Sequence, residues 1–178
     1  FQIKSWVLPI VFVLFMQYSV VNVVLSNKSV NTINTDILLK EITYIDSSFG
    51  NNLSSKKIAF FIDFNDFNCP LCYDDFMAIS NWLSVEKYSK NNVLYIFKEN
   101  SSNSDSLGAE RINIWAEVNE VNYPINLASN DFFEKNKIDK STILLLDEKD
   151  NLFLQLNLPF GETNFEKATE FLLENDNK

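Results

Sequence analysis

The sequence predicts an α/β fold: a three-layer α/β/α sandwich with a central mixed sheet, preceded by one N-terminal transmembrane helix. Apolar, strand-like runs alternate with amphipathic helical stretches along residues 29–178. Two apolar runs near the C-terminus are separated by a short polar turn, which is typical of an antiparallel hairpin. A long uncharged run precedes all of these elements. We therefore expect a membrane anchor at residues 1–28 and one α/β domain at 29–178.

The composition is typical of a folded, acidic protein. The 178 residues are 46% hydrophobic and include 16 phenylalanines, and 24 acidic against 15 basic residues give a net charge of −9. A nucleic-acid partner is excluded because phosphate binding needs a basic surface. The absence of histidine excludes Ser-His-Asp and Cys-His catalysis within this chain. No cofactor or metal site is predicted, since two cysteines complete a zinc site only with carboxylates or a second chain.

The N-terminal run Trp6–Leu25 contains 20 residues without a charge. A helix of that length spans about 30 Å, the hydrocarbon thickness of a bilayer. We expect it to be an uncleaved anchor in the lipid bilayer. Gln17 and Asn22 either mark a face that packs on other transmembrane subunits or are single amides that the bilayer tolerates. The alternatives are a cleaved signal peptide, whose apolar region is usually shorter, and a buried helix of a soluble fold, which usually has a polar face.

The only two cysteines, Cys69 and Cys72, lie between an apolar strand and an amphipathic helix. The run Ile58–Phe64 is apolar except for Asp63, which favours a central strand buried on both faces. After Cys72 the apolar residues follow a helical period, and Pro70 suits the first helical turn. The expected buried positions of this helix are Phe76, Ile79 and Leu83.

A cysteine at a helix N-terminus faces unpaired backbone N–H groups, which lower its pKa. We therefore expect Cys69 to be the nucleophile and Cys72, one turn later, the resolving thiol. Asp63, buried in the strand, would have a raised pKa and accept the proton of Cys72. The alternatives are a structural disulfide or two buried thiols, and an Asp63 that faces water from an edge strand. Asp74 and Asp75 act against ionisation of the cysteines, because negative charge disfavours a thiolate.

The remaining elements follow from periodicity and turn residues. Thr35–Ile45 predicts either a strand or a short helix. The other expected elements are strands at 93–97, 142–146 and 152–156, a short strand or extended segment at 123–127, and helices at 106–121, 131–137 and 164–174, the last capped by Thr163.

The stretch Ile62-Asp63-Phe64-x-x-x-x-Cys69-Pro70-Leu71-Cys72 resembles the active-site strand and turn of thioredoxin-fold proteins. The helix and short strand between Ser106 and Leu127 resemble the insertion of bacterial TlpA/ResA-like, membrane-anchored thiol–disulfide oxidoreductases and of peroxiredoxin-like relatives. The resemblance covers roughly Ile37 to Asn175. It implies a thioredoxin-like fold, a redox-active disulfide, protein thiols or disulfides as substrates, and a periplasmic domain on the cytoplasmic membrane.

The sequence departs from that family at Ser141. Thioredoxin-fold proteins carry a cis-proline just before the strand equivalent to Thr142–Leu146, where it packs on the disulfide and orients the substrate main chain. Here Lys140 and Ser141 hold that place. A cis bond before serine costs about 2.5–4 kcal/mol, so we expect a trans peptide.

The sequence leaves two functions open: an active thiol–disulfide oxidoreductase, or a catalytically weak or inactive accessory subunit of a membrane complex. A peroxidase is disfavoured, since no Thr-x-x-Cys with a supporting arginine is present.

Overall fold

The computed structural model describes residues 38–42, 46, 49, 55–99 and 105–174. All of them belong to one compact unit, Ile33–Lys178. The expected membrane span Trp6–Leu25 lies outside the described residues. Within the described ranges, no helix is long and apolar enough to cross a bilayer.

The centre of the domain is a five-stranded mixed sheet in the order β3-β2-β1-β4-β5. The strands are β1 (Lys57–Ile62), β2 (Val93–Lys98), β3 (Ile125–Ala128), β4 (Thr142–Leu146) and β5 (Leu152–Asn157). The central strand β1 runs parallel to β2 and antiparallel to β4. β4 and β5 pair antiparallel, as expected for a hairpin. The predicted mixed sheet is therefore confirmed.

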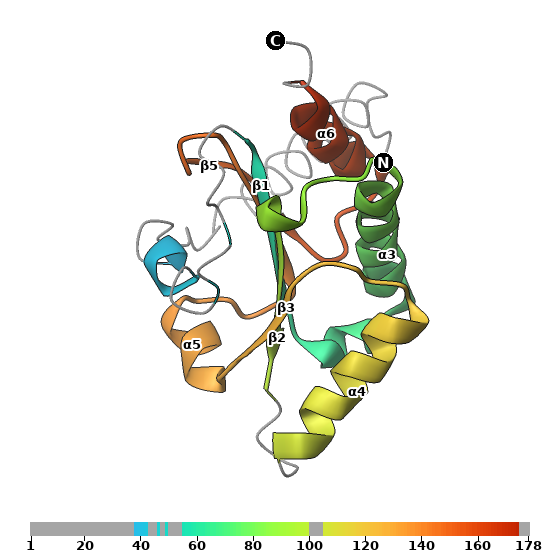
Figure 1. Ribbon diagram of the computed structural model, residues 1–178, viewed down its shortest axis with the longest axis vertical. Coiled ribbons are helices and arrows are strands. Elements are labelled where there is room, and N and C mark those ends of the chain that lie inside the picture. The colour runs from blue at the N-terminus through green and yellow to red at the C-terminus, as the bar shows by residue number, and fades with distance from the viewer. Residues whose placement is uncertain (1–37, 43–45, 47–48, 50–54, 100–104, 175–178) are drawn as a thin grey trace, which may run out of the picture. The chain divides into compact units, whose positions relative to one another are not determined.

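Helices cover both faces of this sheet, which gives the three predicted layers (Figure 1). One face carries α3 (Pro70–Val85), α4 (Asp105–Val118) and α6 (Glu162–Leu173). The other face carries α5 (Asn130–Lys135) and the helical residues 38–42. The stretch 35–45, for which a strand and a helix were both open, is thus helical at 38–42.

Alternation along β1 divides the core into two halves. Phe60 faces the α3 side, where its ring stacks on Tyr95 at 4.3 Å and meets Phe76 edge-on at 5.5 Å. Phe61, the next residue, faces α5. Each fully buried ring contributes about 2–3 kcal/mol through removal of apolar surface from water. A strand buried on both faces needs a continuous apolar run, which is what β1 has.

The structure corrects the end of the first strand and the cap of the final helix. β1 stops at Ile62, and the Asp63 side chain accepts the Asn65 N–H (3.0 Å) to start the 3₁₀ helix η1 (Phe64–Asn68). The final helix is capped by Gly161, not by Thr163. Gly161 has a φ of 72°, a left-handed conformation that glycine adopts without a steric penalty.

Candidate active site

The two cysteines lie where the carboxyl end of β1 leads through η1 into α3. Cys69 is the N-cap residue of α3, and Pro70 follows at the start of the helix, where its missing N–H has no consequence. The Cys72 N–H points at Cys69 and donates to its Sγ at 3.4 Å. Both residues are free thiols. The predicted position of the pair at a strand-to-helix junction is confirmed.

The two thiols occupy different electrostatic environments. Hydrogen bonds from the Cys72 side chain and backbone lower the pKa of Cys69, which is partly exposed. Cys72 is only 6% exposed, and burial, followed by its contact with Cys69, raises its pKa to about 11. Negative charge on Asp66 and Asp75 raises it further. One sulfur is therefore partly exposed with a lowered pKa, while the other is buried with a raised pKa. The roles of nucleophile for Cys69 and resolving thiol for Cys72 stay predictions.

Asp63 is not the buried strand carboxyl that the sequence predicts. Its side chain is 23% exposed and its Oδ2 lies 3.2 Å from the Lys98 Nζ. Asp63 and Lys98 are adjacent because each comes directly after a member of the pair Ile62–Phe97 in the parallel ladder of β1 and β2. The strand ends at Ile62, two residues before the predicted Phe64, so the Asp63 carboxyl leaves the core and pairs with the Lys98 ammonium. The predicted burial of Asp63 in the strand is therefore wrong, and its role in proton transfer stays a prediction.

Ser141 lies beside the carboxyl end of β1, because Phe61 pairs with Thr142. It is 0% exposed. Its N–H donates to Asp66 Oδ2 at 2.8 Å, and its Oγ accepts the Asp63 N–H at 2.9 Å. Its peptide is trans, since the cis bond recorded among the described residues is at Pro159. The trans prediction is confirmed.

Lys140, the neighbour of Ser141, has an exposed side chain. Its backbone carbonyl accepts the Thr142 hydroxyl at 2.8 Å, which holds the start of β4. The part of Lys140 that the structure engages is therefore its backbone, and a role of its side chain in substrate binding stays a prediction.

Sequence reasoning missed Asp66 as a member of this site and missed the contact made by Asp75. Asp66 comes three residues before Cys69, one turn of a 3₁₀ helix, which is a spacing that could have been noticed. The Asp75 carboxylate accepts the N–H groups of Phe160 (2.6 Å) and Gly161 (2.8 Å). These donors lie more than 80 residues away, so no local pattern indicates them.

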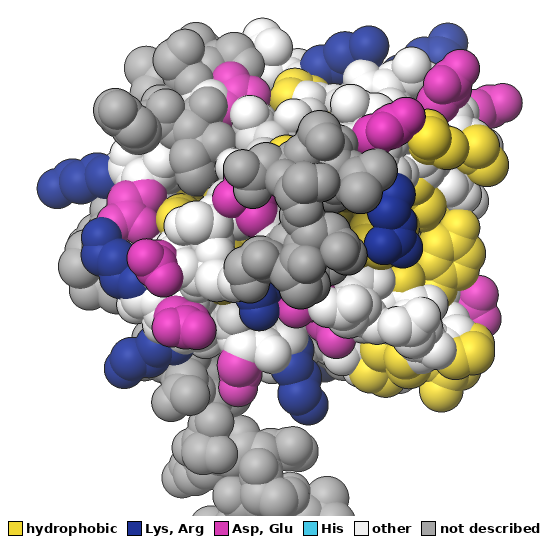
Figure 2. Space-filling model, turned by 90° about the horizontal axis from the view of Figure 1, so that it is seen from below, with side chains coloured by type: hydrophobic (Ala, Val, Ile, Leu, Met, Phe, Trp, Pro, Cys, Tyr) yellow, Lys and Arg dark blue, Asp and Glu magenta, His cyan; other side chains and the backbone are white. Residues whose placement is uncertain are grey.

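Apolar side chains surround the cysteine pair. Phe67 packs against Phe76 (5.0 Å) and Trp115 (5.5 Å), which joins η1 to α3 and α4. Leu71, between the cysteines, is 66% exposed. Figure 2 looks onto this end of the sheet, and hydrophobic side chains gather on the side where α3 and α4 lie.

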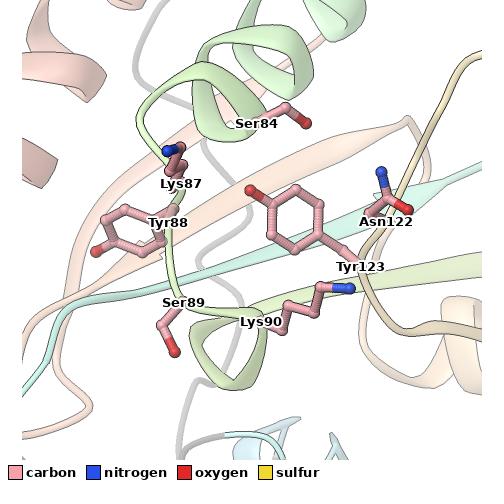
Figure 3. Close-up of a pocket in the computed structure, with 7 residues that line it drawn as sticks. All are labelled: Ser84, Lys87, Tyr88, Ser89, Lys90, Asn122 and Tyr123. Carbon is pink, nitrogen blue, oxygen red and sulfur yellow. The ribbon is translucent and has the colours of Figure 1, made fainter.

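A cavity of about 380 Å³ lies at the opposite end of α3 from the cysteines. Its lining comes from the last turn of α3, the turn that follows and the segment before β3 (Figure 3). It contains neither cysteine and is not part of the thiol site. The residues that line this cavity are Ser84, Lys87, Tyr88, Ser89, Lys90, Asn122 and Tyr123.

Within the described ranges, no group of three or more cysteine, aspartate or glutamate side chains gathers in a way that could hold a metal ion.

No protein-family model matches this chain, and no curated protein matches it. Solved structures do match. A thioredoxin-like protein from Porphyromonas gingivalis is 18% identical with a TM-score of 0.50, over 70% of this chain and 80% of that one. A thioredoxin-like protein determined in its oxidised form is 16% identical with a TM-score of 0.51, over 69% and 82%. A further thioredoxin-like superfamily protein is 9% identical with a TM-score of 0.51, over 70% and 83%. At these identities the likeness concerns architecture, and the described domain has the thioredoxin-like fold.

Proposed function

We propose that this protein is a membrane-anchored thiol–disulfide oxidoreductase that works by dithiol/disulfide exchange at Cys69 and Cys72. Its substrates are the thiols or disulfides of other proteins. The proposal places the chain among TlpA/ResA-like enzymes, tethered to a bacterial cytoplasmic membrane through Trp6–Leu25. The redox domain lies on the periplasmic side.

The observation that carries the proposal is the contrast between the two thiols. The Cys69 sulfur is accessible, accepts the Cys72 N–H and has a lowered pKa. Cys72, one helical turn later, is buried and its pKa is about 11. Thiolates are the nucleophiles in disulfide exchange, so only Cys69 is prepared to attack a partner. A structural disulfide or a pair of inert buried thiols does not require this contrast.

The exchange proceeds in two substitutions at sulfur. The Cys69 thiolate attacks one sulfur of a substrate disulfide, which breaks the S–S bond and releases one substrate thiolate that takes up a proton. Cys72 then loses its proton and attacks Cys69 Sγ, which breaks the mixed disulfide and releases the second substrate thiol. The protein ends as the Cys69–Cys72 disulfide, and two electrons have passed to the substrate. The reverse sequence oxidises a substrate dithiol.

In this proposal Asp63 accepts the proton of Cys72. Its carboxylate lies at the end of β1, pairs with Lys98 and caps the start of η1, the segment that leads to the cysteines. Asp63→Asn tests the role: the second substitution should slow, with mixed disulfides persisting longer, while alkylation of Cys69 stays unchanged. An unaltered rate of resolution would remove Asp63 from the mechanism.

The test of the function uses the full chain in a bacterial membrane. Cys72→Ser leaves Cys69 able to attack but removes the resolving thiol, so mixed disulfides with partner proteins should accumulate after acid quenching and alkylation. The matched control is the double variant Cys69→Ser/Cys72→Ser, which should trap nothing. Absence of adducts, together with reduction of insulin disulfides by the wild type no faster than by the double variant, would refute the enzyme.

A separate experiment tests the membrane anchor and the location of the domain. The full chain should stay with the membrane after an alkaline carbonate wash, and a chain lacking residues 1–28 should be released. A protease added to spheroplasts should digest the redox domain. Release of the full chain by carbonate, or protection from the protease, would refute the anchoring and the periplasmic location respectively.

A second function, an inactive accessory subunit of a membrane complex, is favoured by one observation. The Ser141 N–H is already bonded to Asp66, beside the place where relatives hold the main chain of their substrate. An accessory subunit would co-purify with transmembrane partners in a manner that depends on residues 1–28 and persists in Cys69→Ser. An oxidoreductase would lose its trapped partners in that variant.

A further inference from the structure

Asp66 is fixed on the same side of the chain as Cys69. Side chains three residues apart in a 3₁₀ helix eclipse one another, and the Cys69 N–H donates to the Asp66 carbonyl at 3.0 Å to close that turn. The Asp66 carboxylate is then held in place by the Ser141 N–H at 2.8 Å. Resting on the proposed function, we propose that Asp66 is a positioning residue whose fixed negative charge beside the thiols makes the Cys69/Cys72 pair a stronger reductant.

The hydrogen bond from Ser141 explains why the carboxylate stays there. Ser141 is fully buried, and a buried backbone N–H needs an acceptor. A proline at this position has no N–H and makes no such demand. The serine therefore introduces a donor, and Asp66 supplies the acceptor. The second hydrogen bond of Ser141, from the Asp63 N–H to its Oγ, fixes the other end of η1.

The charge of Asp66 acts on both sulfurs. It raises the pKa of Cys69 against the larger lowering effect of the Cys72 hydrogen bonds, and it adds to the raised pKa of Cys72. Asp75 on α3 acts in the same direction on Cys72. From the neighbouring elements, Lys98 is paired with Asp63 at the strand ends and the Arg111 guanidinium lies over the Phe64 ring, while Lys140 is exposed.

The effect on redox chemistry follows from the charges of the two forms. Above the pKa of Cys69, the disulfide takes up two electrons and one proton to give one thiolate and one thiol. The disulfide carries no charge and the reduced pair carries one negative charge. A neighbouring carboxylate disfavours the reduced form, so the pair gives up electrons more readily. Removing the carboxylate should stabilise the reduced form.

Asp66→Asn is the informative variant, because its amide oxygen still accepts the Ser141 N–H while the charge is gone. Thiolate absorbance should show the acid dissociation constant of Cys69 rising roughly threefold. Above the pKa of Cys69, the equilibrium constant for oxidation by glutathione disulfide should fall by the same factor, equivalent to about 15 mV at 29.6 mV per tenfold change. The control is Asp74→Asn. The sequence led us to expect that Asp74 also disfavours the thiolate, but the exposed Asp74 is not among the charges that shift either thiol, so this variant should change neither quantity.

One further variant separates the N–H of Ser141, which holds Asp66, from its hydroxyl, which accepts the Asp63 N–H. Ser141→Ala keeps this N–H and should leave the ionisation of Cys69 at the wild-type value. Equal values for Asp66→Asn, Asp74→Asn and the wild type would overturn the inference. The proposed function would survive that result, because it depends on trapped partners in the Cys72→Ser strain. If no partners were trapped but Asp66→Asn still shifted the ionisation of Cys69, the electrostatic role would stand and the enzyme would fall.

Discussion

Asp75 should hold the start of α6 against α3 through two backbone hydrogen bonds. Its Oδ2 accepts the N–H groups of Phe160 at 2.6 Å and Gly161 at 2.8 Å. Hydrogen bonds to a charged group contribute about 1.5–3 kcal/mol each when buried, and less here because Gly161 is exposed. In Asp75→Ala the N–H groups of Phe160 and Gly161 lose this acceptor and must hydrogen-bond to water instead. We expect the free energy of unfolding to fall by about 2 kcal/mol.

Urea unfolding followed by tryptophan fluorescence measures this change, with Asp74→Ala as the matched control. Asp74 is the adjacent, exposed acid on the same helix, and its removal should change the free energy of unfolding by less than about 0.5 kcal/mol. Asp75→Asn should lie between the two, because an amide oxygen still accepts both N–H groups. If Asp75→Ala and Asp74→Ala unfold at the same urea concentration, the carboxylate does not hold the two elements together.

Three further results are expected. At pH 7, iodoacetamide should modify Cys69 well before Cys72, because the pKa of Cys69 is lowered and that of Cys72 is about 11; equal rates would contradict the contrast. Between pH 9 and 11 the unfolded state loses the Cys72 proton while the folded state keeps it. Stability should therefore fall by up to about 3 kcal/mol more than in Cys72→Ala, and parallel curves would contradict this. Asp150→Asn should cost about 2–3 kcal/mol by leaving the buried Lys57 ammonium without its partner. Lys57→Met in that background should restore stability, as judged by urea unfolding.

The sheet could be predicted because its strands carry their burial in the sequence. β4 has the predicted bounds, since Thr142–Leu146 is a continuous apolar run between polar turns. The buried positions of α3 were also predictable, because Phe76, Ile79 and Leu83 follow the helical period. These elements depend on local pattern, and local pattern is what a sequence displays.

The details of the site depend on side chains that meet across the fold. Asp63 reads as a strand residue because apolar residues flank it, but its carboxylate binds the N–H that starts η1 and pairs with Lys98 on β2. The Asp66–Ser141 hydrogen bond joins residues 75 positions apart. Capping and ion pairing determine where these carboxylates lie. Neither can be predicted until it is known which strands are neighbours in the sheet.

The most direct test of the redox pair is an equilibrium titration of its thiols. The full chain is incubated in dithiothreitol buffers of graded potential, quenched with acid, alkylated and weighed by mass spectrometry. We predict one two-electron transition between a form with two alkylated cysteines and a form with none, the Cys69–Cys72 disulfide. Two alkylated cysteines in every buffer, or oxidation only between separate chains, would contradict the assignment of Cys69 and Cys72 as a working pair.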